Sequence, residues 1–183
     1  MIRAFRPSVE REHAVETFAR GLVGGARCLV LGPLRSVADV YLPFRVYQVT
    51  IERGANLDAC VLGLDAMTGA LDLYRFDGVP SVPDVVEVRT RNHPEPVVST
   101  TSARDILQSR IERMTYQRFG FMSGRIRVEM AAIDGELHVP YWVGFFGRGN
   151  EASIVVMDAV RGRIEGAKVR RLIREWISSQ EVP

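Results

Sequence analysis

Few side chains in this chain have the types and spacing that catalysis or metal binding requires. The three histidines, His13, His93 and His138, form neither an H-x-x-x-H nor an H-E-x-x-H pair, and Cys28 and Cys60 are far apart in the sequence. Zinc sites usually take pairs of ligands from within a few residues of each other. The chain also lacks the G-x-S-x-G segment that presents a nucleophilic serine. We therefore predict no metal, no cofactor and no catalytic site, and hence no enzyme.

Two aspartates, Asp65 and Asp158, occupy corresponding places in two similar stretches and resemble a pair of catalytic carboxylates. Each begins an Asp-Ala-x-x-Gly segment, which ends at Gly69 in the first stretch and at Gly162 in the second. An aspartate that begins a turn accepts hydrogen bonds from backbone N–H groups two or three residues later. We therefore interpret all four residues as structural turn residues.

The similarity between these stretches extends over residues 41–73 and 138–166. Both run from a Pro-aromatic pair through a strand-like segment to an Arg-Gly turn, and then through an apolar run to Asp-Ala-x-x-Gly. The second copy is shorter by the same two residues before and after the Arg-Gly turn. A hairpin that keeps its register must shorten equally in both arms. The pattern therefore predicts a repeated β-hairpin.

The same order of elements, helix followed by three strands, is expected in each half of the chain. In the first half, Gly24 and Gly25 should end a helix over residues 8–22. In the second half, Ser102 and Asp105 resemble the capping box that begins a helix. The three strands are expected at 28–34, 40–52 and 57–64 in the first half, where 71–76 continues as a further strand, and at 126–132, 137–146 and 152–157 in the second.

These elements lead us to predict an α+β fold, built as a tandem αβββ repeat with antiparallel sheets, packed helices and a pseudo-twofold relation. A half of this size buries too little apolar surface to be stable alone, so we expect the parts to pack as one domain. The parts are a first repeat at 1–76, a proline-rich connector at 77–100 with a short strand at 85–88, a second repeat at 101–166, and a C-terminal amphipathic helix at 167–183.

The two Asp-Ala-x-x-Gly segments, each closing a hairpin, resemble PepSY-like domains. That family typically has a D-A-x-T-G-x-hydrophobic motif; residues 65–71 (DAMTGAL) match it, and residues 158–164 (DAVRGRI) match it with Arg161 in place of threonine. PepSY-like domains are mostly small non-catalytic modules, and many are exported with peptidases or membrane proteins. The resemblance implies a non-enzymatic binding or regulatory module. Because the first residues lack the apolar run of a signal peptide, we do not expect a peptidase-inhibitor role.

Aromatic side chains gather on the second hairpin. Successive strand residues point to opposite faces, so Trp142 and Phe146 share one face while Tyr141 and Phe145 share the other. Two interpretations are open: these residues pack in the core, or one face contacts a partner.

The last helix, expected over residues 167–178, is amphipathic and has no counterpart after the first repeat. It either packs on its own sheet or offers its basic face to a partner. Its apolar stripe consists of Val169, Leu172, Ile173 and Trp176, and its polar side includes Arg171 and Arg174. Combined with the hairpin, this helix provides our candidate partner-binding residues: Trp142, Phe146, Leu172, Trp176, Arg171 and Arg174.

Composition narrows the choice of function. The chain has 183 residues, 46% of them hydrophobic and 25% charged, with a net charge of +2. Nucleic-acid-binding domains usually have a larger basic excess, so we keep nucleic acid only as a minor alternative, through the interleaved arginines and aromatic residues of 104–127. No stretch is long enough for a transmembrane helix. Two cysteines without a signal peptide are typical of a cytoplasmic protein.

Two functions from different classes remain after these exclusions. The first is a non-catalytic accessory or regulatory module that binds a protein partner in the cytoplasm. The alternative is a small-ligand-binding domain with an apolar pocket between sheet and helices.

Overall fold

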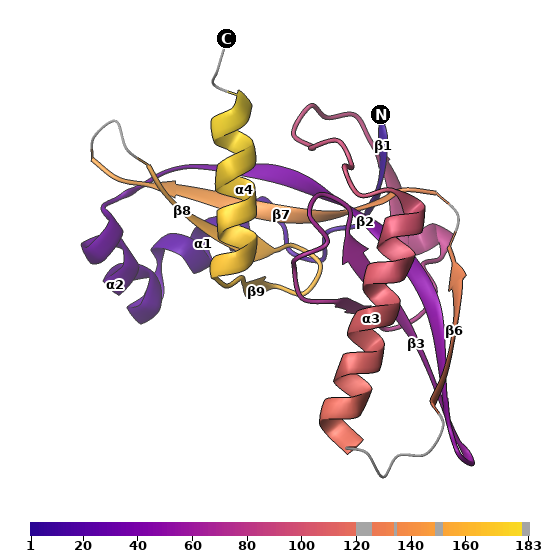
Figure 1. Cartoon of the computed structure of the whole chain (residues 1–183). Helices are drawn as coiled ribbons and strands as arrows, with labels where there is room; N and C mark the ends of the chain where they lie inside the picture. Colours follow the sequence, from indigo (N-terminus) through magenta and orange to yellow (C-terminus); the bar gives the residue numbers. More distant parts are fainter. Residues whose placement is uncertain (120–125, 134, 149–151, 181–183) are drawn as a thin grey trace. The chain divides into compact units, whose positions relative to one another are not determined.

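The fold is α+β, as predicted. The computed structural model describes residues 1–119, 126–133, 135–148 and 152–180. Within these ranges the chain forms four α-helices, one short 3-10 helix and a mixed sheet of nine strands (Figure 1). The helices are α1 (Arg11–Ala19), α2 (Gly21–Leu31), α3 (Thr100–Phe119) and α4 (Ala167–Gln180), and η1 covers Val82–Asp84. The strands are β1 (Ile2–Phe5), β2 (Leu34–Arg53), β3 (Asn56–Asp65), β4 (Tyr74–Phe76), β5 (Val85–Val88), β6 (Ile126–Ala132), β7 (Leu137–Phe146), β8 (Ser153–Asp158) and β9 (Arg163–Ile164).

The chain divides into two compact units, and neither coincides with a predicted repeat. Unit 1 consists of Met1–Leu42, Val86–Pro94 and His138–Pro183, and unit 2 of Pro43–Val85 and Glu95–Leu137. Each unit therefore takes residues from both halves of the sequence. The strand β2 passes from one unit to the other, because its first residues belong to unit 1 and its last residues to unit 2. The predicted repeat and its pseudo-twofold relation stay predictions.

Unit 1 is built around the antiparallel pair β7–β8. Trp142 lies opposite Met157 in this pair, β8 continues to β9, and β1 pairs with β7 in parallel. The helix α4 packs on β8 (Figure 1). A core forms where Phe18 of α1 meets Phe146 edge to face, with ring centroids 6.4 Å apart. Such an aromatic pair adds to the stabilisation that the buried area alone provides.

Unit 2 is a four-stranded antiparallel sheet covered on one face by α3 (Figure 1). The strand order is β4, β3, β2, β6, and β2 and β3 form the long hairpin that the sequence predicts. The core between sheet and helix contains Tyr47, Val49 and Leu64 from the strands and Leu107 and Ile111 from α3. Because side chains alternate along a strand, only every second residue of β2 and β3 reaches this core.

The prediction for residues 28–34 is wrong, because most of this apolar run belongs to the helix α2 and not to a strand. A short apolar run without a clear period is compatible with both structures. The expected helix over 8–22 is also split, since Arg20 has extended backbone angles between α1 and α2. Gly24 lies inside α2, where an added Cβ would be 2.7 Å from the Ala19 carbonyl carbon. Its role is thus close packing of α2 on α1 rather than a helix end.

The start of α3 also differs from the prediction. Ser99, not Ser102, caps this helix, because its Oγ accepts a hydrogen bond from the Ser102 N–H at 3.1 Å. In the sequence, Gly120 and Gly124 follow this helix and predict its end, and both lie outside the described residues. Most of the remaining expected strands agree closely with β3, β5, β6, β7 and β8, and the last expected helix agrees with α4.

Candidate ligand-binding site

Unit 2 contains a cavity of about 560 Å³ between α3 and the sheet. We call it the helix-side pocket, and its lining residues are Ile51, Asp58, Ala59, Cys60, Leu62, Leu73, Arg75, Ile111, Met114 and Thr115. This volume is within the range of about 300–1,000 Å³ that is usual for small-molecule sites. Apolar side chains make up most of its wall, and charged groups are restricted to Asp58 and Arg75 among these residues.

The alternation of side chains along the strands, and their spacing around α3, explain which side chains reach the helix-side pocket. Ile51 of β2 and Leu62 of β3 are partly buried on the sheet face that α3 covers. Ile111 and Met114 are three residues apart on α3, so they lie on one side of the helix. Arg75 stands opposite Leu62 in the β3–β4 register, which places its side chain on the same sheet face. The arginine therefore lies on the same face as Leu62, in a wall that also contains the Asp58 carboxylate.

The electrostatics around Cys60 argue against nucleophilic chemistry at this site. Burial raises the pKa of the Cys60 thiol; the charge of Arg75 lowers it by a lesser amount, and the charge of Asp58 raises it. A thiol with a raised pKa is protonated at neutral pH and reacts slowly. The Thr115 hydroxyl donates to the Ile111 carbonyl oxygen at 2.8 Å, an ordinary bond within a helix. Neither the Cys60 thiol nor the Thr115 hydroxyl is therefore activated as a nucleophile in this arrangement.

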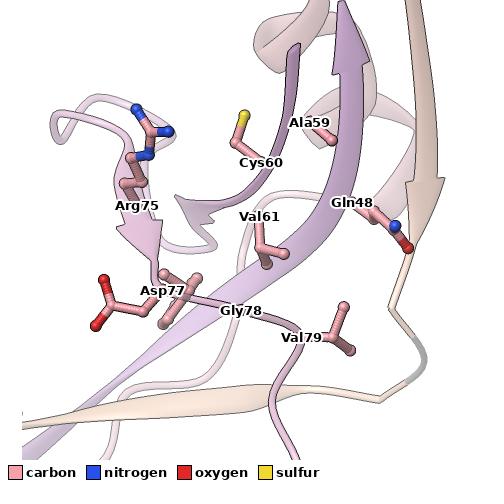
Figure 2. Close-up of a pocket in the computed structure, with 9 residues that line it drawn as sticks. Gln48, Ala59, Cys60, Val61, Arg75, Asp77, Gly78 and Val79 are labelled. Atoms are coloured by element: carbon pink, nitrogen blue, oxygen red, sulfur yellow. The ribbon is translucent and has the colours of Figure 1, made fainter. Parts of the chain in front are cut away.

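A second cavity, the edge pocket, lies next to the first and shares Ala59, Cys60 and Arg75 with it. Its volume is about 350 Å³. Figure 2 shows Cys60 and Val61 projecting to opposite sides of β3, as neighbouring strand residues must. Its other lining residues are Gln48, Val61, Phe76, Asp77, Gly78 and Val79. The strand β4 pairs with Val61–Gly63 of β3, so both pockets adjoin the part of β3 that precedes this pairing.

The structure places the predicted hairpin residues in the core of unit 1. Phe146 is fully buried, and Trp142 is half-buried against the same cluster. The Trp142 indole Nε1 donates to the Val9 carbonyl oxygen at 2.8 Å. The two side chains do share a face, as the alternation predicted. That face packs against residues of α1, so Phe146 does not offer a surface to a partner.

The C-terminal helix α4 likewise has a buried apolar side and an exposed polar side. Val169, Leu172 and Ile173 are buried on the sheet, and Trp176 is half-buried. On the outer side Arg171 and Arg174 are exposed, and the Arg171 Nε lies 3.7 Å from a Glu175 carboxylate oxygen. Of the six candidate residues, the two arginines are the exposed ones.

The carboxylate of Asp65 organises the first Asp-Ala-x-x-Gly turn. Its Oδ1 accepts hydrogen bonds from the backbone N–H groups of Thr68 at 2.8 Å and Gly69 at 3.1 Å, and its Oδ2 accepts from the Leu71 N–H at 2.8 Å. Gly69 has a φ of +66°, which glycine adopts without strain. Arg110 of α3 donates to the carbonyl oxygens of Gly69 and Leu71. These are the bonds that the turn interpretation expects.

The second turn has the same construction with fewer bonds. The Asp158 Oδ1 accepts from the backbone N–H groups of Val160 at 2.8 Å and Arg161 at 2.9 Å, and Gly162 has a φ of +67°. The Arg161 Nε lies 3.9 Å from the Asp158 Oδ2. Asp65 belongs to unit 2 and Asp158 to unit 1, and each Oδ1 accepts hydrogen bonds from N–H groups of its own turn, whereas the buried Asp158 Oδ2 has no hydrogen-bond partner among the described residues.

Two histidines that are distant in the sequence meet in unit 1. The rings of His93 and His138 are perpendicular with centroids 5.6 Å apart, and the His138 Nδ1 lies 3.2 Å from the Arg3 carbonyl oxygen. No sequence spacing indicated this pair. Among the described residues no group of three or more histidine, cysteine or acidic side chains could hold a metal ion. Cys28 and Cys60 are free thiols.

The arginines and aromatic residues of segment 104–127, our minor nucleic-acid alternative, differ in their contacts and exposure. Arg110 is bonded to the first turn, and Arg127 forms an ion pair with Glu129 at 3.1 Å. Arg104 and Tyr116 are exposed on α3, whereas Phe121 and Arg125 lie outside the described residues. The described arginines therefore do not form one free basic surface.

Comparisons of the chain with protein-family models, with curated proteins and with solved structures find no match. Within the described part of the chain, no helix is long and apolar enough to cross a membrane. The function of the chain is therefore inferred from the geometry of the site itself.

The raised pKa of Tyr41 in unit 1 predicts that the stability of the fold depends on pH. Burial, the charge of Asp39 and a hydrogen bond to Asp39 raise its pKa from 10.0 to about 12. A group whose folded pKa is raised stabilises the fold below its unfolded pKa, and this contribution is lost as pH rises through the folded value. We expect the unfolding free energy of the wild type to fall from pH 10 to about 12 more steeply than that of Tyr41→Phe. Urea unfolding at several pH values measures this difference, and equal slopes would contradict it.

Proposed function

We propose that the protein binds a small amphipathic molecule, with an apolar body and an anionic group, in the helix-side pocket. The observation that carries the proposal is a cavity of about 560 Å³ whose wall combines Leu62, Ile111 and Met114 with the cation of Arg75. An apolar cavity with a few polar groups is the usual form of a ligand site. The guanidinium of arginine pairs well with carboxylate, sulfonate or phosphate groups.

Binding without catalysis is part of the proposal. The protonated thiol of Cys60 and the internally bonded hydroxyl of Thr115 support it, because neither group is activated. Free thiols at Cys28 and Cys60 fit a reducing compartment, so we place this activity in the cytoplasm.

A protein-binding accessory or regulatory role, our first expectation from the sequence, is the second candidate. Its proposed PepSY-like character is supported by the two Asp-Ala-x-x-Gly turns alone. The burial of Phe146 and Leu172 removes two of the residues to which we assigned the contact. The specific observation that still favours an interaction is the accessible basic side of α4, with Arg171 and Arg174. The ligand-binding proposal uses a formed cavity and is therefore the stronger of the two.

The test uses two fluorescent probes that differ in charge. 8-Anilinonaphthalene-1-sulfonate has an apolar body and a sulfonate, whereas N-phenyl-1-naphthylamine lacks the sulfonate. Met114→Trp, at an exposed position of the pocket wall, should fill the cavity and weaken the binding of both probes. Arg75→Gln should weaken only the sulfonate probe, by about threefold to fivefold, because exposed charge pairs are screened by water. Titrations followed by fluorescence give the dissociation constants.

A matched control distinguishes the specific effect of losing Arg75 from the general effect of losing one arginine. Arg174→Gln removes an exposed arginine of unit 1 and should leave the affinity for both probes unchanged. Bound probe should also slow the reaction of Cys60 with a thiol reagent, measured in a Cys28→Ser background. Equal affinities of the wild type, Met114→Trp and Arg75→Gln for the sulfonate probe would refute the proposal.

A further inference from the structure

The helix α2 has one face that is apolar and almost fully exposed to solvent. Leu22, Val23, Leu29 and Val30 are 95%, 71%, 88% and 82% exposed, and Ala26 between them is exposed as well. Residues at these spacings follow one side of a helix. Soluble proteins rarely leave a continuous apolar surface uncovered. This face is therefore the strongest unassigned interaction surface among the described residues.

The orientation of α2 is determined by its inner side. Gly24 packs closely on Ala19, while Cys28 and Leu31 pack against the core of unit 1. The Arg27 guanidinium donates to the carbonyl oxygens of Thr17 at 3.1 Å and Phe18 at 3.2 Å. These contacts attach the helix to α1 with its other side outward. The helix α2 is therefore packed on its inner side, and poor packing does not explain why its outer face is exposed.

The apolar positions of this face are spaced symmetrically about Ala26, with leucine and valine interchanged between its two ends. The sequence LVGGARCLV has a Leu-Val pair at each end, and Ala26 lies midway between Leu22 and Val30, and between Val23 and Leu29. In a twofold dimer the same surface meets itself, so residue i contacts residue j and j contacts i. Two antiparallel copies of α2 centred on Ala26 would place Leu22 against Val30 and Val23 against Leu29. The small Ala26 side chain at the centre would let the helices approach closely.

We propose that the α2 face is the twofold interface of a homodimer, with α2 packed antiparallel on α2 of a second copy. The self-complementary spacing supports a second copy, since a different partner would require no such symmetry. A lipid surface fits the helix less well. Interfacial helices combine apolar residues with lysine or arginine on the polar side and often with aromatic anchors. The helix α2 has no lysine and no aromatic residue, and Arg27 is already bonded to two carbonyl groups.

The size of the surface indicates a reversible dimer. Stable interfaces bury about 800 Å² on each partner, usually with 20–30 residues on each side. One face of an eleven-residue helix is smaller than this. We therefore expect dissociation in the micromolar range, visible as a concentration-dependent mass in sedimentation velocity.

Charge pairing tests the antiparallel arrangement. Val23→Lys and Leu29→Glu each place a charge against an apolar side chain, so each variant alone should dimerise at least about tenfold more weakly. A mixture of the two variants should restore the dimer, because position 23 of one copy faces position 29 of the other. A mixture of Val23→Lys with Val23→Glu is the control, since it would restore only a parallel dimer. Both positions are exposed, so thermal unfolding should show that each variant is folded.

Cross-linking tests the position of the twofold axis. In a Cys28→Ser background, Ala26→Cys should form an intermolecular disulfide under mild oxidation, and Ser178→Cys on α4 should not. A wild type that is monomeric at all concentrations tested, or a dimer unaffected by Val23→Lys, would overturn the proposal. Wild-type binding to phosphatidylcholine–phosphatidylglycerol vesicles, lost in Val23→Lys and without any dimer, would also overturn it in favour of a lipid surface.

Discussion

Replacement of Asp65 by alanine is expected to lower the free energy of unfolding by about 3–5 kcal/mol. The Asp65 side chain is 1% exposed, and its carboxylate accepts hydrogen bonds from the N–H groups of Thr68, Gly69 and Leu71. Alanine would leave the N–H groups of Thr68 and Leu71 without this acceptor, whereas the Gly69 N–H would keep the carbonyl oxygen of residue 65 at 3.2 Å. Hydrogen bonds to a charged group contribute about 1.5–3 kcal/mol each, and the loss is partly relieved where water can enter. Denaturant unfolding of both proteins measures the difference.

The second turn provides a matched comparison within the same chain. Among the described residues, the Asp158 Oδ1 accepts from the N–H groups of Val160 and Arg161, and its Oδ2 has no hydrogen-bond partner. We therefore expect Asp158→Ala to cost less than Asp65→Ala, about 2–3 kcal/mol. Asp65→Asn keeps one oxygen acceptor and should fall between alanine and the wild type. If Asp65→Ala were as stable as the wild type while both carboxylates proved necessary for some activity, the turn interpretation would be wrong.

Replacement of Phe146 by alanine is expected to lower the free energy of unfolding by a similar amount, about 3–5 kcal/mol. The ring is fully buried and contacts Phe18 edge to face in the core of unit 1. Removal of a buried aromatic ring loses its transfer free energy and leaves a cavity. Thermal and urea unfolding measure this loss.

Phe145, the next residue along β7, is the control for this substitution. It is only partly buried and points to the opposite face of the strand. Phe145→Ala should therefore cost clearly less than Phe146→Ala. A contact residue would behave differently, because its replacement would leave the isolated protein stable and weaken only an interaction. Unchanged stability of Phe146→Ala would thus revive the partner-binding hypothesis for this side chain.

The sequence predicted the fold best where side-chain alternation and turn residues agree. The hairpin of β2 and β3 and the segments β5, β6 and β7 were found in this way, since turn glycines and period-2 patterns are local signals. The apolar run at 28–34 gave no such agreement, because its side chains are apolar on all sides. The structure shows why: α2 buries Cys28 partly on one side and exposes Leu29 and Val30 on the other.

The candidate site could be predicted only in outline. An apolar pocket between sheet and helix was one of two functional alternatives, yet its residues could not be named from the sequence. Ile51, Leu62, Arg75 and Met114 come from four elements, and only the strand register and the packing of α3 bring them together. The exposed face of α2 was missed for a related reason, because a helix and a strand expose different subsets of the same apolar residues.

The composition of the two units has a consequence for synthesis on the ribosome. Residues 43–137 contain every segment of unit 2, so this unit has its full set of strands and α3 once they have been synthesised. Unit 1 cannot complete its core until β7 and β8 have been synthesised. The reason is that Phe18 and Val37 pack against Phe146, Val155 and Met157. During that interval the first 42 residues, including the apolar helix α2, have been made but lack the strands that complete their core. Nascent chains that emerge close together on one messenger would then present this helix to one another before either chain is finished.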